Sequence, residues 1–459
     1  MFSKALLKEF KTILGHDKVF TDKADLVTYS YDAAVLDPVI PALALRPTSS
    51  EALGNAVRLC NENGIPLTVR GAGTNLSGGT IPLAQGAVIL TNALDRILEI
   101  NTADMYAVVQ PGVITAKLAS AVADKELFYP PDPGSQAVST MGGNVAENAG
   151  GLRGLKYGVT RDYVMGLTFF DVKGERVKTG AKTVKCATGY NLAGLMVGSE
   201  GTLGVFDEIT LKLIPRPAHQ KAMIAVFDEI HNASETVAAI IAKHIVPATL
   251  EFMDNFTIRA VEAFSHAGLP VEAAALLLIE VDGHPAQVEE DASRVEALCR
   301  QMGATSIQVA KDAAERDKVW EARRSALSAL AKLKPTLVLE DATVPRSKIP
   351  EMVEAMQQIA ARYNLAIGTF GHAGDGNLHP TILTDRRDKN EWERVEDAIA
   401  AIFTKALDLG GTLSGEHGTG IAKARFLEKE TSRATIVYSQ KIKAALDPKN
   451  ILNPGKIFQ

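Results

Sequence analysis

Two histidines stand close together in the segment Gly371–His379, which reads Gly-His-Ala-Gly-Asp-Gly-Asn-Leu-His. The apolar residues 365–370 before it are typical of a short strand. A regular strand places alternate residues on opposite faces, but glycines permit a sharp bend. The sequence therefore predicts a glycine-rich loop that turns His372 and His379 toward one point.

A carboxylate and a third imidazole follow at Glu416 and His417. Two histidines and one carboxylate, with one position left open, form the usual ligand set of a catalytic divalent metal. We therefore expect His372, His379 and Glu416 to bind a metal, with zinc as the first expectation and iron or manganese as alternatives. The competing interpretation is that these residues only satisfy backbone groups around glycine turns.

A glycine-rich loop, Arg70–Gly79, directly follows a predicted strand at residues 65–69. Such a loop can direct several backbone N–H groups at one anion, and pyrophosphate is the natural guest. The segment lacks the third glycine of a dinucleotide-binding fingerprint, since that position is Leu76, and it lacks the lysine of a nucleotide-triphosphate loop. The alternative is a glycine-rich surface hairpin.

Three further stretches are rich in glycine or proline. Residues 129–135 contain three prolines and one glycine, which exclude a helix or a central strand. Residues 139–151 and 198–204 are crowded with small residues. Glycines at a contact surface allow the main chain to approach a flat ring closely. These stretches therefore favour contact with a large planar ligand.

Composition limits the class of protein. The chain of 459 residues is long enough for two or three domains, and 46% hydrophobic with 22% charged residues is ordinary for a globular protein. A net charge of -5 argues against nucleic acid as a partner. No apolar run is long enough to span a membrane, and the scattered Cys60, Cys186 and Cys299 encode neither disulfides nor an iron–sulfur site. We expect a cytoplasmic protein, with attachment to the inner face of the membrane as the alternative.

The order of patterns predicts an α+β fold. Helices are expected over residues 1–15, 48–63, 115–125, 234–243, 286–302 and 392–409, and strands over residues 42–45, 65–69, 87–91, 107–110, 209–214, 249–253 and 275–281. Pro215 and Pro217 mark a domain boundary. In the second half, helices on one face of an antiparallel sheet would leave the other face free to cover a ligand.

Taken together, the segments 70–79, 130–134, 139–151 and 198–204 resemble FAD-binding oxidoreductases of the vanillyl-alcohol oxidase type. The resemblance is to the branch that holds the catalytic subunits of glycolate oxidases and the FAD-linked D-lactate dehydrogenases, and it continues through residues 320–323, 340–345, 371–379, 415–420 and 452–455. It implies a two-part FAD-binding domain at residues 1–214, a substrate-binding α+β cap with an antiparallel sheet at 215–414, and a segment at 415–459 that returns to the FAD domain.

The resemblance also implies which residues contact FAD. The pyrophosphate would lie in the glycine-rich loop, the flavin and ribityl chain along the next two stretches, the adenosine half at the fourth, and the ring near a C-terminal asparagine. These residues are Arg70, Gly71, Ala72, Gly73, Thr74, Asn75, Ser77, Gly78, Gly79, Pro131, Asp132, Pro133, Thr140, Gly142, Gly143, Asn144, Ala146, Asn148, Gly150, Glu200, Gly201, Gly204, Val205 and Asn453. For Asn453 a role as a turn residue before Pro454 is the alternative.

Relatives that bind FAD covalently use a histidine in the pyrophosphate loop, and Arg70–Gly79 contains none. We therefore expect noncovalent FAD. The resemblance implies that Arg323 binds the substrate carboxylate, although a solvated helix arginine and the adjacent Arg324 are alternatives. Relatives that oxidise D-2-hydroxyglutarate carry a lysine where this chain has Leu339, so a substrate with two carboxylates is disfavoured.

The expected activity is oxidation of D-lactate to pyruvate by an FAD- and metal-dependent D-2-hydroxy acid dehydrogenase, with hydride transfer to flavin N5 and His417 as the general base. A glycolate oxidase or dehydrogenase subunit of a larger electron-transfer complex is the first alternative, and a noncatalytic flavin-binding module is the second. The expected partners are a small 2-hydroxy acid and an external electron acceptor, such as an electron-transfer flavoprotein, an iron–sulfur subunit, a cytochrome or a quinone. A homodimer is the expected alternative to a monomer.

Overall fold

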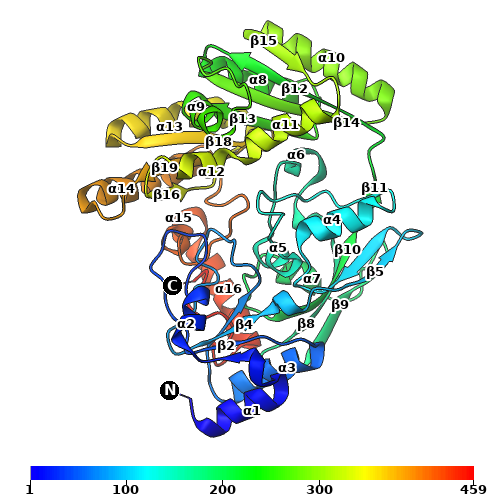
Figure 1. Ribbon diagram of the computed structural model, residues 1–459, viewed down its shortest axis with the longest axis vertical. Helices are drawn as coiled ribbons and strands as arrows, with labels where there is room; N and C mark the ends of the chain where they lie inside the picture. Colours follow the sequence, from blue (N-terminus) through cyan, green and yellow to red (C-terminus); the bar gives the residue numbers. More distant parts are fainter. Residues whose placement is uncertain (1, 459) are drawn as a thin grey trace. The chain divides into compact units, whose positions relative to one another are not determined.

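The computed structural model describes residues 2–458 and divides into two compact units (Figure 1). The first unit comprises residues 1–150, 159–216 and 416–459, and the second comprises residues 151–158 and 217–415. The sequence-predicted limits fell after residues 214 and 414, and no pattern in the sequence indicated that residues 151–158 leave the first unit. The predicted first helix begins at Met1, which lies outside the described residues; helix α1 covers Lys4–Leu14.

The first unit contains a four-stranded sheet in the order β1-β2-β4-β3. Strands β2 (Leu43–Leu45), β4 (Ala87–Leu90) and β3 (Leu67–Arg70) run parallel, and β1 (Val19–Phe20) is antiparallel. Helix α3 (Ser50–Glu62) begins where the Ser49 hydroxyl accepts from the Ala52 N–H and ends before Gly64, which has a φ of +64°. Its apolar face joins α1 in the core beside this sheet.

A second sheet of the first unit is antiparallel, in the order β5-β6-β10-β8-β9. Its strands are β5 (Ile97–Asn101), β6 (Tyr106–Val109), β10 (Val205–Lys212), β8 (Val164–Phe170) and β9 (Arg176–Gly180). Helices α4 (Thr115–Ala123), α5 (Met141–Glu147) and α7 (Leu192–Met196) contribute apolar residues to its core. A short pair, β7 (Leu127–Phe128) and β11 (Ile214–Pro215), completes the strands.

The second unit is built on an eight-stranded antiparallel sheet. Seven strands follow the order β15-β12-β14-β13-β18-β19-β16, and β17 also pairs with β19. The bounds are β12 (His219–Phe227), β13 (Thr249–Asp254), β14 (Ala275–Gly283), β15 (Ala304–Val309), β16 (Thr336–Leu339), β17 (Ala342–Thr343), β18 (Ala366–His372) and β19 (Asn377–Thr384). Strand β14 is buried along nearly its whole length, which explains its continuous run of apolar residues.

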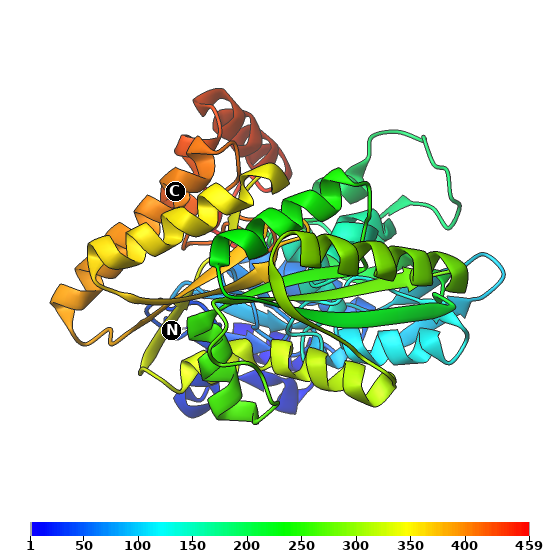
Figure 2. The same ribbon diagram turned by 90° about the horizontal axis from the view of Figure 1, so that it is seen from above.

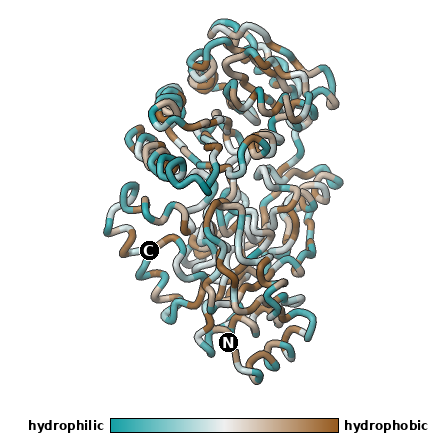
Figure 3. Tube along the Cα trace, turned by 60° about the vertical axis from the view of Figure 1, so that its left-hand side comes forward, coloured by the Kyte–Doolittle hydropathy of each residue, from teal (hydrophilic) through white to brown (hydrophobic). Residues whose placement is uncertain are grey.

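Helices pack on both faces of this sheet, and the expectation of helices on one face is wrong (Figure 2). One face carries α8 (Ile230–Ala242), α10 (Pro285–Gln301), α13 (Ile349–Tyr363) and α14 (Lys389–Asp408), and the other carries α9 (Asn255–Ser265), α11 (Ala313–Arg324) and α12 (Ala326–Ala331). Hydrophobic and hydrophilic stretches alternate along these helices in the trace of Figure 3. Each sheet face therefore has its own apolar contact layer.

The remaining helices are short, except at the C-terminal end of the chain. They are α2 (Lys23–Leu26), α6 (Gly154–Tyr157), α15 (Leu427–Glu430) and α16 (Arg433–Leu446), and 3-10 turns occur at residues 16–18, 27–29, 91–93, 160–162, 346–348 and 424–426. Within residues 2–458, no helix combines the length and the apolar character that crossing a membrane requires.

Candidate active site

A β-hairpin, rather than an open loop, brings the two histidines together. His372 is the last residue of β18 and His379 is the third residue of β19. In the register of this pair, His372 lies opposite Asn377, and His379 lies opposite Phe370. The two histidines are therefore diagonal neighbours on one face of the sheet. Their ring centroids are 5.1 Å apart, with the planes at 89°.

The turn of this hairpin depends on glycine. Gly376 has a φ of +90°, and a Cβ there would lie 2.1 Å from the carbonyl oxygen of Val344. The Gly374 N–H donates to the carbonyl of Leu250, which ties the turn to the neighbouring strand β13. The glycines that suggested a loop therefore form the tight connection of two paired strands.

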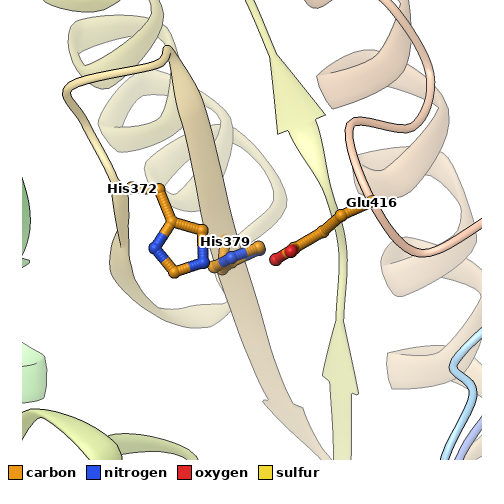
Figure 4. A group of neighbouring side chains, drawn as sticks. All are labelled: His372, His379 and Glu416. Carbon is orange, nitrogen blue, oxygen red and sulfur yellow. The ribbon is translucent and has the colours of Figure 1, made fainter. Parts of the chain in front are cut away.

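Glu416 completes a group of three side chains that could hold a metal ion (Figure 4). It directly follows Gly415, the last residue of the second unit. One ligand atom from each of His372, His379 and Glu416 lies within 4.8 Å of the other two. Both histidines are buried and Glu416 is partly buried. Two imidazoles and one carboxylate match a catalytic metal centre, so the chemistry of this donor set fits a divalent cation.

The backbone before Glu416 is fixed by close packing. The Thr412 N–H donates to the carbonyl of Thr343, and the Ser414 hydroxyl donates to a carboxylate oxygen of Asp341 at 2.8 Å. A Cβ at Gly415 would lie 2.3 Å from the Thr343 hydroxyl oxygen. Only glycine fits at position 415, and this close approach sets where Glu416 emerges. The next residue, His417, is partly buried.

A buried glutamate that the sequence analysis did not single out lies behind the histidines. Glu251 Oε1 is 2.8 Å from His372 Nδ1, while Oε2 accepts from Arg323 Nε at 2.8 Å and lies 2.6 Å from Arg323 Nη2. Burial alone would raise the pKa of Glu251, but the charges of His372 and Arg323 and their hydrogen bonds outweigh it, so the net pKa is lowered. Its one sequence signal is an acid between the apolar residues Leu250 and Phe252 of strand β13.

Arg323 is placed by this carboxylate at the end of α11. Its side chain is buried, and its guanidinium carbon lies 4.7 Å from the ring centroid of Phe370, the residue opposite His379. The adjacent Arg324 is exposed. Of the two arginines considered from sequence, Arg323 is therefore the one connected to the histidine pair, through Glu251.

The glycine-rich loop of the first unit presents its backbone donors to no protein acceptor. Within residues 2–458, none of the N–H groups of residues 71–79 donates to the protein, although Ser77, Gly78 and Gly79 are buried. Buried N–H groups in folded proteins are almost always hydrogen-bonded. The loop therefore fits an anionic group such as the pyrophosphate of FAD.

Side chains of the same unit hold this loop in shape. Asp32 accepts from the Asn75 side chain at 2.8 Å and from the Thr80 N–H at 3.3 Å. Arg70 donates to the carbonyl of Tyr31 at 2.6 Å and packs against Gly73. Burial lowers the pKa of Arg70, and the charge of Asp32 opposes this effect. Arg70 and Asn75 thus stabilise the conformation of the loop.

The second glycine stretch contains helix α5, which the sequence analysis did not predict. Its first N–H groups are used within the protein: Met141 donates to Val113, Gly142 donates to Pro111, and Gly143 donates to the Thr140 hydroxyl. A Cβ at Gly142 would lie 2.7 Å from the Pro111 side chain. Gly142 therefore serves packing between segments of the chain. The neighbouring predicted contacts are buried at Asn144, Asn148 and Gly150 and partly buried at Ala146.

Several other predicted FAD contacts have structural roles. Glu200 accepts from the N–H groups of Thr419 and Gly420, both at 2.7 Å, so its carboxylate holds the C-terminal segment. The Asn453 amide donates to the carbonyls of Gly79 and Glu200, and its oxygen accepts from Thr68. Gly201 has a φ of +70°. The predicted contacts Pro131, Asp132, Pro133, Gly204 and Val205 are buried.

Three acids of the first unit, Asp32, Glu147 and Glu200, interact with one another near these contacts. A Cβ at Gly79 would lie 2.9 Å from Glu147 Oε1, and a Cβ at Gly418 would lie 2.2 Å from Glu147 Oε2. Burial, followed by the charges of Glu200 and Asp32, raises the pKa of Glu147 well above its ordinary value. The sequence analysis named Glu200 but missed Glu147 and Asp32, because the three acids come from distant segments of the chain.

The chain matches two protein-family models and is similar to full-length relatives. A family model described as the C-terminal domain of FAD linked oxidases matches residues 216–457, and one for an FAD binding domain matches residues 41–180. The glycolate oxidase subunit GlcD of Bacillus subtilis (strain 168) is 49% identical, with 100% of this chain and 97% of that protein covered. A D-lactate dehydrogenase of Anaerostipes hadrus is 34% identical, with 98% and 97% covered.

Solved structures show the same fold at low identity. A p-cresol methylhydroxylase with bound substrate matches with a TM-score of 0.82 at 17% identity, covering 99% of this chain and 96% of that chain. An alkyldihydroxyacetonephosphate synthase matches with a TM-score of 0.78 at 18% identity, covering 99% and 86%. The predicted vanillyl-alcohol oxidase type of fold is confirmed. With its two matching domains and these full-length relatives, the chain belongs to the FAD-linked oxidoreductase family that includes GlcD glycolate oxidase subunits and D-lactate dehydrogenases.

Proposed function

We propose that this chain is an FAD- and metal-dependent dehydrogenase of small 2-hydroxy acids that carry one carboxylate. The observation that carries the proposal is the group of His372, His379 and Glu416, whose ligand atoms lie within 4.8 Å of one another, with Arg323 connected to it through Glu251. The 49% identical glycolate oxidase subunit makes glycolate the first substrate to test, and D-lactate, the substrate expected from sequence, the second.

The cofactor sites follow from the residues described above. Residues 71–79 would receive the FAD pyrophosphate, because their backbone N–H groups have no acceptor within residues 2–458. The loop contains no histidine, which favours noncovalent FAD. His372, His379 and Glu416 would hold a divalent cation, for which zinc, iron and manganese are the candidates. When bound, FAD supplies a hydride acceptor, and the cation supplies a Lewis acid that lowers the pKa of a substrate hydroxyl.

The chain's own residues would handle the proton and the carboxylate. Glu251 contacts Nε and Nη2 of Arg323, so Nη1 would donate to the substrate carboxylate. His417 would accept the hydroxyl proton on an imidazole nitrogen, because histidine titrates near neutral pH. The C2–H bond breaks as a hydride, the O–H bond breaks as a proton, and a 2-oxo acid forms. An external electron acceptor would then reoxidise the enzyme.

Anaerobic mixing with substrate tests the proposal. Glycolate or D-lactate should bleach the visible absorbance of the bound flavin, whereas L-lactate and D-2-hydroxyglutarate should reduce it much more slowly. Removing metal with a chelator should abolish bleaching by every substrate, and added zinc, iron or manganese should restore it. His417→Asn should keep FAD but lose bleaching. No bleaching by any of these acids in the metal-loaded protein would favour the noncatalytic flavin-binding module.

The state of the flavin is tested by precipitation with acid. Noncovalent FAD should pass into the supernatant, and yellow colour that stays in the pellet would contradict this part of the proposal.

A further inference from the structure

We propose that Glu251 is a positioning residue that serves the metal site and the carboxylate-binding arginine at once. One oxygen would fix the ring of His372 with its Nε2 lone pair available to the cation, and the other would hold Arg323. This inference rests on the proposed function, because it concerns the same metal site. It adds a residue that contacts neither the metal nor the substrate.

The geometry assigns a separate oxygen of Glu251 to each partner. Oε1 lies 2.8 Å from His372 Nδ1, and Oε2 lies 2.8 Å from Arg323 Nε and 2.6 Å from Arg323 Nη2. Glu251 is 0% exposed, so its oxygens are shielded from bulk solvent. The side chain lies on β13, which pairs with β18 next to His372. The contact with His372 therefore joins neighbouring strands of one sheet, and the contact with Arg323 joins this sheet to helix α11.

The chemistry of the partners fixes the tautomer of His372. An ionised carboxylate only accepts hydrogen bonds, so the short contact to Oε1 requires a proton on Nδ1. In the neutral ring the lone pair then resides on Nε2, and this nitrogen would be the metal ligand. Carboxylates that orient metal-binding histidines in this way strengthen metal binding.

The same carboxylate also keeps Arg323 in place. A buried guanidinium without a partner is strongly unfavourable, and Glu251 supplies the opposite charge. Phe370 covers the guanidinium at 4.7 Å from its ring centroid. The plain alternative is that Glu251 only neutralises Arg323, in which case its loss would leave the binding of metal to His372 unchanged.

Glu251→Gln separates these two roles. A glutamine has one acceptor oxygen, and the charged guanidinium should take it. The amide NH₂ would then face His372 Nδ1 and donate to it, which moves the ring proton to Nε2 and blocks the metal-binding nitrogen. We expect zinc affinity to fall by about 10- to 100-fold. Nitrogen-15 NMR of labelled histidine should report the change of tautomer.

Glu280→Gln is the matched control. Glu280 is a buried acid on β14, the strand next to β13, and it accepts from the Trp320 indole N–H at 2.9 Å. Its substitution makes the same chemical change in the same sheet, and its hydrogen bond goes to Trp320 of the same helix α11 instead of to a histidine. Zinc affinity in this variant should stay within about twofold of the unchanged protein.

The measurement uses the full chain loaded with FAD and competition between the protein and a chromophoric chelator for Zn²⁺. If the unchanged protein binds neither zinc nor iron nor manganese at this site, the proposed metal-dependent function fails. If it binds zinc and Glu251→Gln binds as tightly as Glu280→Gln, with the tautomer of His372 unchanged, the positioning role of Glu251 is overturned.

A second comparison covers the case in which Glu251→Gln does not fold. Arg323→Met keeps the carboxylate on His372, and the double variant Arg323→Met with Glu251→Leu removes it without leaving a buried guanidinium unpaired. Zinc affinity should be at least about 10-fold weaker in the double variant than in Arg323→Met alone. Equal affinities would overturn the inference.

Discussion

Two acids on the same strand show how neighbours decide the charge of a side chain. Glu251 lies between His372 and Arg323, and its interactions with these two side chains lower its pKa despite its burial. Asp254, at the end of β13, accepts hydrogen bonds from Thr257 and Thr369, and burial outweighs them and raises its pKa to about 6. The strand thus carries one acid that stays charged and one that takes up a proton in mildly acidic solution.

Asp254 gives a prediction for the pH dependence of stability. Its folded pKa of about 6 lies above the ordinary value of 3.8, so the folded state binds more protons than the unfolded state between these values. The contribution of Asp254 to the free energy of unfolding should therefore increase as pH falls through 6. Between pH 7.5 and pH 5.0 the gain is about 1.4 kcal/mol. Asp254→Asn should lose this gain.

Urea denaturation of both proteins at the two pH values measures the effect. Asp388→Asn is the control, because Asp388 caps α14 through the Glu391 N–H in the same way but at the surface. A pH-dependent difference of the same size in Asp388→Asn, or none in Asp254→Asn, would contradict the prediction.

Residue types indicated much of the candidate site, because imidazole, carboxylate and guanidinium groups are recognisable by their chemistry. His372, His379 and Glu416 do come together. The role of Glu251 was not predicted. An acid between apolar strand residues usually pairs with a cation, and the sequence does not reveal which cation. The roles of Glu200 and Asn453 also depend on partners more than 200 residues away.

At the scale of elements, the hairpin β18–β19 determines the histidine geometry. The apolar residues 365–370 predicted the first strand of the hairpin. The second strand was not predicted, because it contains Asn377, His379 and Pro380. These residues have low strand propensity, and pairing with β16 and β18 overrides it. Helix α5 was not predicted for a related reason, because Gly142 and Gly143 disfavour a helix. Hydrogen bonds to Pro111 and Thr140 stabilise this helix in the structure.

Gly376→Ala tests the importance of the hairpin turn. A methyl group there meets the Val344 carbonyl at 2.1 Å and also requires a positive φ from a residue with a side chain. We expect a loss of about 3 kcal/mol in the free energy of unfolding, from about 1 kcal/mol of backbone strain and about 2 kcal/mol of steric displacement. Zinc affinity should fall as well, because His379 lies three residues further along β19.

Gly268→Ala is the matched comparison for the turn. Gly268 has a φ of +83°, and a Cβ there would meet nothing within 4 Å. This variant should lose only about 1 kcal/mol and should keep its zinc affinity. Equal losses in both variants would mean that the contact with Val344 relaxes without cost.

At the scale of the molecule, the C-terminal segment completes the first unit. The Leu67 N–H donates to Ile451, the Asn453 N–H donates to Leu67, and the Asn453 side chain reaches Thr68, Gly79 and Glu200. The sequence analysis placed this segment near the flavin domain through a family resemblance. Periodicity could not have located it, because the contacts join residues almost 400 positions apart.

Asn453→Ala should therefore weaken FAD binding. It removes two donors and one acceptor that hold β3 and the end of the glycine-rich loop together, which is worth roughly 2–3 kcal/mol in total. The ratio of FAD to protein after gel filtration, taken from the absorbance spectrum, should fall. Lys449→Ala, an exposed change in the same segment, should leave the ratio unchanged. Full FAD occupancy in Asn453→Ala with an unchanged dissociation constant would refute this role.

The path of the chain has a consequence for how the protein is made. Residues 151–158 leave the first unit to join the second, where Lys156 and Tyr157 bind Asp282. A gene fragment that encodes only residues 217–415 would lack these partners, and a ribosome must reach Asn453 before the first unit has all its parts. A cut at residue 217 therefore removes part of the second unit, and the first unit is complete only after residues 416–459 have been synthesised.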